Sequence, residues 1–287
     1  MNTVIEIYGV PPPKNYYPSE EQREFFAAKV PTKAPFPLIK DINCGWELEV
    51  EGISAENVTL AYNKYPLIYC THTEDGSLKD YGKEYIAKGP LMNEHLENSL
   101  IELNYINSLL KNGFNFTHRC SFHVHLNVAD LPLSQVDAIT TLYMLAEPLF
   151  MSYCENHRRG SSYCIPLNAL QMTKKELQAV FHKETKYWAM SFNRITDLGT
   201  LEFRALHGTV NLELLFTWVS IIQSLKVAAK QFNQKISKIL NEIATPEEAV
   251  HFLMYIFPLQ SVQNKLTGLT REIEDSLFNT KYFLGNH

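Results

Sequence analysis

Hydrophobic and polar residues alternate without a break in three short segments of the chain, at positions 45–51, 120–127 and 200–205. Because successive side chains of a strand point to opposite faces, this pattern predicts three β-strands with one apolar and one polar face each. The polar faces carry Glu47, Glu49 and Glu51 in the first segment, His123, His125 and Asn127 in the second, and Glu202 and Arg204 in the third. Strands disfavour glutamate, so three such faces indicate a shared polar site.

The pattern of apolar positions also gives the extent of the predicted strands. They cover residues 42–51, 67–73, 84–87, 119–128, 186–194 and 200–206. Glu74-Asp75-Gly76-Ser77 is a turn signal after the second strand, and Asp197-Leu198-Gly199 is one between the last two.

Elsewhere apolar residues recur every three or four positions, which predicts helices. These cover residues 94–111, 134–153, 173–182, 212–240, a segment that opens at Thr245, and roughly 261–277. Three of their N-termini carry capping signals, which are Ser134 with Asp137, Thr173 with Glu176, and Thr245-Pro246 with Glu248.

Half-apolar strands interspersed with helices favour the α+β class, with an antiparallel sheet whose apolar face is covered by helices. The 287 residues suffice for one large domain or two small ones. We expect an N-terminal arm rich in proline and aromatic residues at 1–40, a core at 41–210, and a C-terminal helical part of the same domain at 211–287. Residues 4–8 of the arm are expected to form a short strand.

Composition narrows the class of protein. Hydrophobic residues make up 45% of the chain and charged residues 20%, as in ordinary soluble globular proteins. The net charge of −5 gives no general basic field for nucleic acid, which leaves only a local basic patch open. The N-terminus has no signal-peptide pattern, no apolar run reaches the roughly 20 residues of a membrane helix, and the five cysteines are scattered, so we expect a cytoplasmic protein.

The acidic pair Glu47 and Glu49 is the first candidate for chemistry. Adjacent carboxylates on one face repel each other and are stabilised by divalent cations such as Mg²⁺ or Mn²⁺, which prefer oxygen ligands. The alternative is a solvated strand face, and Glu51 at the strand end fits that description best.

The second and third strands offer different ligands. His123 and His125 share one face and are either plain hydrogen-bonded histidines or metal ligands, and zinc competes with a harder cation for imidazoles. Glu202 and Arg204 are either a surface ion pair or, beside bound metals, a ligand and a clamp for phosphate oxygens.

The order of these motifs resembles a known family. Cys44-Gly45-Trp46-Glu47-Leu48-Glu49, Glu74-Asp75-Gly76-Ser77-Leu78 followed by Glu84, Ser121-Phe122-His123-Val124-His125, and Gly199-Thr200-Leu201-Glu202-Phe203-Arg204 with Gly208-Thr209 are similar to the amidoligases of the glutamine synthetase and glutamate–cysteine ligase superfamily. Phages and bacteria often encode such proteins. The resemblance covers about residues 42–210, and Glu84 matches only a Gly-x-Glu pattern.

The resemblance implies an ATP-dependent carboxylate–amine ligase that forms an amide through an acyl phosphate, on a curved antiparallel sheet that holds ATP and two or three Mg²⁺ ions. It implies that Glu49 and Glu84 hold one metal, and that Glu47, His123 and Glu202 hold another nearer the transferred phosphoryl group. His125 and Asn127 would lie against the nucleotide phosphates. Arg204 would stabilise the γ-phosphoryl group.

Other roles are assigned on residue type alone. Arg194, Arg158 and Arg159 are candidates for binding phosphate or a substrate carboxylate, or else ordinary surface arginines. An amine that attacks an acyl phosphate must lose a proton, and Asp75 is a candidate base. The expected partners are small-molecule or peptide carboxylates and amines, and assembly into a homo-oligomer stays open.

Three alternatives remain at this point. One is a phosphotransferase of the guanidino-kinase kind on the same fold, and another is a zinc hydrolase that uses His123 and His125 with Glu202 as third ligand. The third is a catalytically inactive interaction module. Against the third, none of the expected polar positions has been replaced by an apolar residue.

Overall fold

The computed structural model describes residues 2–79, 82–180 and 185–285, apart from the side chains of Val180 and Gln234. The chain divides into two compact units. The strand unit comprises Pro13–Asn127 and Leu206–Ser220, and the helical unit comprises Met1–Pro12, Val128–Ala205 and Ile221–His287. The expected division into arm, core and C-terminal part stays a prediction.

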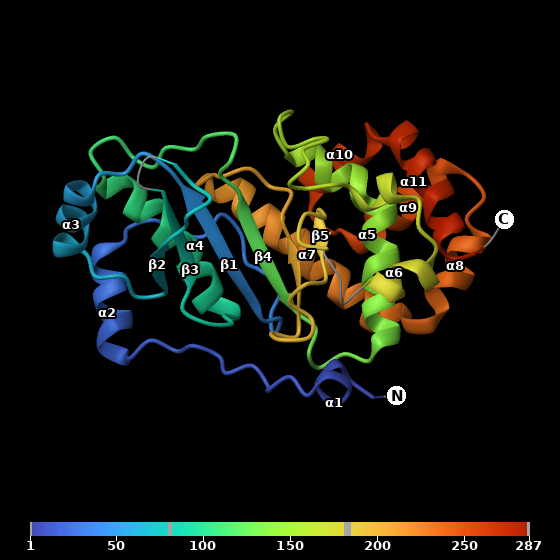
Figure 1. Cartoon of the computed structure of the whole chain (residues 1–287), viewed down its shortest axis with the longest axis horizontal. Coiled ribbons are helices and arrows are strands. Elements are labelled where there is room, and N and C mark those ends of the chain that lie inside the picture. The colour runs from blue at the N-terminus through green and yellow to red at the C-terminus, as the bar shows by residue number, and fades with distance from the viewer. Residues whose placement is uncertain (1, 80–81, 181–184, 286–287) are drawn as a thin grey trace. The chain divides into compact units, whose positions relative to one another are not determined.

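Four antiparallel strands form the sheet of the strand unit (Figure 1). In spatial order they are β2 (Cys70–Glu74), β3 (Lys83–Ala87), β1 (Cys44–Val50) and β4 (Phe122–Asn127). The α+β class is therefore confirmed. The sheet is not strongly curled, so the curved shape of glutamine synthetase stays a prediction.

The apolar face of this sheet packs on α4 (Asn93–Leu109). Trp46 and Leu48 are buried, and the Trp46 indole N–H donates to the Ser99 hydroxyl on that helix at 2.8 Å. The smaller helices α2 (Glu20–Lys29) and α3 (Ala55–Lys64) contribute aromatic rings, with Phe26 against Tyr69 and Tyr62 stacked on His72. Burial of one face leaves the other for the polar residues.

Glu102 fixes the segment that leads into β2. This fully buried carboxylate on α4 accepts hydrogen bonds from the Tyr65 hydroxyl and from the backbone N–H groups of Ile68, Tyr69 and Cys70, at 2.8–3.0 Å. Burial raises its pKa, and these donors oppose that effect. A single side chain thus satisfies three consecutive backbone donors.

The helical unit contains the remaining elements apart from the first part of α7. They are α1 (Val4–Tyr8), α5 (Leu133–Tyr153), η1 (Leu167–Leu170), α6 (Lys174–Val180), β5 (Met190–Ser191), β6 (Thr200–Phe203), α7 (Leu212–Phe232), η2 (Asn233–Lys235), α8 (Ile236–Glu242), α9 (Pro246–Ile256), α10 (Gln260–Thr267) and α11 (Thr270–Phe283). Helix α7 begins in the strand unit and continues into the helical unit from Ile221. Strands β5 and β6 pair antiparallel, and Phe203 of β6 packs on Phe150 of α5.

Several local predictions were wrong. Residues 4–8 form a helix and not a strand, because Thr3 and Glu6 make a capping box and Gly9 ends the helix with positive φ. Helix α5 starts without a side-chain cap, since the Ser134 hydroxyl donates to Asn233 instead. The helix expected at 261–277 is two helices, the one expected at 212–240 is interrupted at Asn233–Lys235, and α2 and α3 were not predicted.

Other signals were correct. Thr245 caps α9 with Pro246 in its first turn and Glu248 closing the box, and Thr173 with Glu176 does the same for α6. The predicted end of the α6 helix at His182 lies outside the described residues.

Helix α7 corrects the expectation about membrane helices. It has 21 residues, and a stretch of 18 of them has a mean hydropathy of 1.4, which by length and composition is enough to cross a membrane. Within that stretch 78% is buried, as in the core helix of a globular fold. The buried Lys226 on this helix pairs with Asp130 at 2.6 Å.

We predict that Glu102→Ala lowers the free energy of unfolding by about 3 kcal/mol, because it leaves three buried N–H groups without their acceptor. Chemical denaturation monitored by circular dichroism measures the change. Glu94→Ala, an exposed position on the same helix, is the control and should change stability by less than about 0.5 kcal/mol. Equal stability of both variants would contradict the anchoring role of Glu102.

Candidate metal centre on the polar face of the sheet

The register of the strands brings the predicted acids and imidazoles together on one face. Glu49 of β1 lies directly opposite Glu84 of β3, and Glu47 of β1 lies directly opposite His123 of β4. Directly opposed like charges destabilise a sheet unless something neutralises them. The pair Glu49 and Glu84 therefore favours a bound cation.

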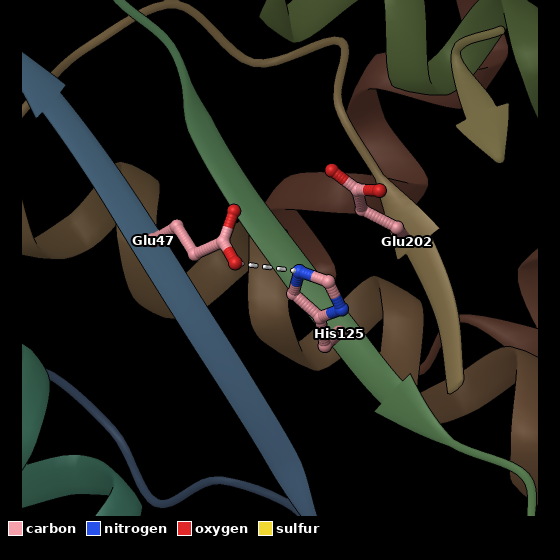
Figure 2. A group of neighbouring side chains, drawn as sticks. All are labelled: Glu47, His125 and Glu202. Atoms are coloured by element: carbon pink, nitrogen blue, oxygen red, sulfur yellow. Dashed lines mark ion pairs between the residues drawn. The ribbon is translucent and has the colours of Figure 1, made fainter. Parts of the chain in front are cut away.

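Glu47 lies between two histidines. One carboxylate oxygen is 3.3 Å from Nδ1 of His123, and the other is 3.2 Å from Nε2 of His125. Figure 2 shows the carboxylate of Glu47 turned from β1 toward the His125 ring on β4. Burial raises the pKa of Glu47, but the hydrogen bonds and positive charge of the two imidazoles outweigh this and hold the pKa well below its usual value.

Among the described residues of the strand unit, two groups of ligand atoms are compact enough to hold a metal ion. In the first, Glu47, Glu84 and His123 each place a ligand atom within 4.8 Å of the others. In the second, Glu49, Asp75 and Glu84 do the same. Carboxylate oxygens dominate both groups, and each has at most one imidazole, which suits Mg²⁺ or Mn²⁺ better than zinc.

Asp75 reaches this face because of the turn after β2. Its side chain accepts a hydrogen bond from the backbone N–H of Ser77 at 2.7 Å, and its carbonyl accepts one from Leu78 at 3.2 Å. This confirms the predicted turn. The position of Asp75 beside Glu49 and Glu84 suits a ligand as well as the predicted base.

Ser121 is a member of this array that the sequence reasoning missed. Both its backbone N–H and its hydroxyl donate to Oε2 of Glu49, the former at 2.9 Å. Its hydroxyl oxygen is also 2.7 Å from Nε2 of His123. Its place two residues before His123 in the alternating segment puts it on the same face and could have indicated it.

Gly45 continues the polar face opposite His125. A Cβ atom built there would meet only the Cβ of His125, at 3.7 Å, so the backbone of β1 lies open at this point.

Glu51 differs from the solvated strand end that the sequence indicated. It is 1% exposed and accepts hydrogen bonds from the Arg119 guanidinium at 2.8 and 2.9 Å and from the Thr117 hydroxyl at 2.8 Å. The guanidinium is the main cause that lowers its pKa to about 2. Glu51 is thus a structural ion pair at the end of β1.

The third predicted strand is β6, which lies in the helical unit. Glu202 and Arg204 share one face near the end of β6 and form an ion pair. Nε of Arg204 is buried and makes no hydrogen bond among the described residues. That Glu202 joins Glu47 and His123 stays a prediction.

The other predicted binding residues have the following contacts. Arg158 is 3% exposed and donates to the backbone carbonyls of Arg204 and Ala205, and Arg159 donates to the carbonyl of Met151 at 3.0 Å. Arg194 is exposed and pairs with Asp197 at 3.0 Å. Asn127 is buried in β4 beside His125. Their roles in binding stay predictions.

Comparison with known proteins supports the resemblance. Residues 95–182 match the model of a family described as "Putative amidoligase enzyme". This segment is a little under a third of the chain and includes the two histidines of β4. Over this stretch the chain is similar to the family that the motifs indicate. A search of curated proteins gives no match.

We predict that the protein binds Mn²⁺ and that Glu84→Gln weakens the binding by more than about tenfold, because Glu84 belongs to both ligand groups. Electron paramagnetic resonance of free Mn²⁺ measures the affinity. Glu74→Gln, an exposed acid at the end of β2, is the control and should bind as the wild type does. Unchanged affinity of Glu84→Gln would rule out these groups as the site.

We also predict a pH signature of the pair Glu51 and Arg119. The pKa of Glu51 falls from 4.5 to about 2 on folding, so the stabilisation is present above pH 4.5 and is lost as the pH falls toward 2. Glu51→Gln should therefore be about 2 kcal/mol less stable at pH 7, and the difference should shrink between about pH 5 and pH 2. Urea unfolding across this range measures it, with the exposed Glu56→Gln as control. A difference that does not depend on pH would contradict the assignment.

Proposed function

We propose that the protein is an ATP-dependent carboxylate–amine ligase that forms an amide bond through an acyl phosphate. The observation that carries the proposal is the array of Glu47, Glu49, Glu84 and His123 on neighbouring strands, within a chain that matches an amidoligase family over 95–182. Such an array suits a reaction in which phosphate charge must be neutralised.

The carboxylate oxygens and the imidazole nitrogen of the array suit divalent cations as ligands. Glu49 and Glu84 oppose each other directly and share the second ligand group with Asp75, while Glu47 and His123 share the first with Glu84. We propose that these residues, with Glu202, hold Mg²⁺, or Mn²⁺ in its place. When bound, such ions neutralise charge on the nucleotide phosphates.

The chemistry requires an activated carboxylate, because a free carboxylate is a poor electrophile. A substrate carboxylate oxygen bonds to the γ-phosphorus of ATP, the bond from that phosphorus to the β–γ bridging oxygen breaks, and ADP leaves. The amine nitrogen then bonds to the acyl carbon, and inorganic phosphate leaves. We propose that Asp75 accepts the amine proton and that Arg204 donates to oxygens of the transferred phosphoryl group.

The remaining residues bind and orient in this proposal. His125, Asn127 and Arg194 would contact nucleotide phosphates, and Arg158 and Arg159 would contact the substrate carboxylate. Glu47 supports a role for His125, because it orients that imidazole from the neighbouring strand at 3.2 Å. We propose a glutamine-synthetase-like sheet, a cytoplasmic setting, and small-molecule or peptide substrates.

The competing functions make different demands. A zinc hydrolase needs His123 and His125 on one ion, and no ligand group among the described residues contains both. A guanidino kinase would share the metal site and stop at the phosphorylated product. An inactive module would bind neither cation nor nucleotide.

Nucleotide binding and turnover test the proposal in two stages. We expect Mg²⁺ and a non-hydrolysable ATP analogue together to raise the melting temperature by several degrees, and Glu47→Gln/Glu202→Gln to abolish the rise. The exposed pair Glu74→Gln/Glu247→Gln is the control. A screen of carboxylates and amines should then find phosphate release that requires both substrates. Release that requires no carboxylate, or no thermal shift at millimolar nucleotide, would contradict the ligase.

A further inference from the structure

Ser121 connects the two ligand groups of the strand unit. Its hydroxyl contacts Glu49, which belongs to the group with Asp75, and His123, which belongs to the group with Glu47. The residue is 3% exposed, so water does not compete freely for its hydroxyl. Neither Glu49 nor His123 can turn without breaking a contact to it.

The number of protons determines the direction of each hydrogen bond. A serine hydroxyl has one proton, and a carboxylate oxygen has none to give, so the proton lies between Ser121 and Glu49. The Ser121 hydroxyl oxygen can then only accept a hydrogen bond from His123, so Nε2 of His123 must carry a hydrogen atom and donate it. Both contacts are satisfied together only in this arrangement.

In the same arrangement Nδ1 of His123 is the nitrogen turned to the first ligand group, where a cation would replace the proton that Nδ1 shares with Glu47. Nδ1 is the nitrogen that faces Glu47, at 3.3 Å. A histidine ligand binds a metal through one nitrogen while the other donates a hydrogen bond that fixes the ring. His123 has this pattern, with Ser121 as the fixing partner.

We propose that Ser121 is a positioning residue that holds Glu49 and His123 in place and reserves Nδ1 of His123 for a divalent cation. This inference rests on the proposed function only for the cation. The hydrogen on Nε2 and its bond to Ser121 are properties of the metal-free protein.

Nuclear magnetic resonance of protein labelled with ¹⁵N-histidine tests the hydrogen bond directly. We expect the wild type to show an Nε2–H signal that is protected from solvent exchange and that His123→Gln removes, which assigns it. Ser121→Ala should lose the protection, and Ser121→Thr, which keeps the hydroxyl, should restore it. Ser99→Ala is the matched control. It removes another buried hydroxyl of the strand unit, on helix α4, which bonds to Trp46 on the opposite face of β1.

Mn²⁺ affinity is the second readout. Loss of a group that orients metal ligands weakens binding by about 10- to 100-fold, so we expect this range for Ser121→Ala and near-wild-type affinity for Ser121→Thr and Ser99→Ala. Circular dichroism checks that each variant is folded. If Ser121→Ala does not fold, Ser121→Thr decides. A protected Nε2–H signal and a Mn²⁺ affinity at wild-type level in Ser121→Thr support the proposal, and loss of both in the folded variant overturns it.

The outcomes separate this proposal from the ligase. A protected signal that persists in Ser121→Ala, or unchanged Mn²⁺ affinity in that variant, overturns the positioning role. The wild type could bind no Mn²⁺ while Ser121→Ala still loses the protected signal. That result supports the hydrogen bond between Ser121 and His123 and overturns the cation site. Normal metal binding without any amide formation overturns only the ligase.

Discussion

The strand unit depends on how it accommodates carboxylates on adjacent strands. Three glutamates of one polar face lie within two neighbouring strands, and two of them oppose each other directly. Left alone, their mutual repulsion would work against the pairing of β1 and β3. The protein offsets it locally, through the imidazoles beside Glu47 and the serine beside Glu49. The placement of positive charge and of hydrogen-bond donors around this face follows from that need.

The opposite face supplies the rigidity that such a site requires. Trp46 and Leu48 are fully buried, and the stacked rings of Trp46 and Phe122 tie β1 to β4. Residues two apart on a strand keep a fixed spacing, so the packing of the apolar set also fixes the polar set. A ligand array built on strands is held more tightly than one built on loops.

Alternation in the sequence was enough to predict the polar faces of β1 and β4, because a strand has a strict period of two. Alternation alone could not predict that Glu49 meets Glu84, which only the family resemblance implied, or that Glu51 meets Arg119, because strand register and a partner 68 residues away depend on tertiary pairing. Short helices were hard to predict from the sequence for a different reason. Helix α1 has only five residues and depends on Thr3, Glu6 and Gly9, which are weak signals beside its β-branched residues.

Glu84 belongs to both ligand groups, and this has a thermodynamic consequence. Two cations that share a ligand cannot bind independently. If a cation in one position changes the affinity of the other by some factor, a cation in the second position changes the affinity of the first by the same factor, as linkage requires. If both ligand groups hold a cation, as proposed, the binding isotherm reports a pair of positions, and a dissociation constant assigned to either one alone has no fixed value.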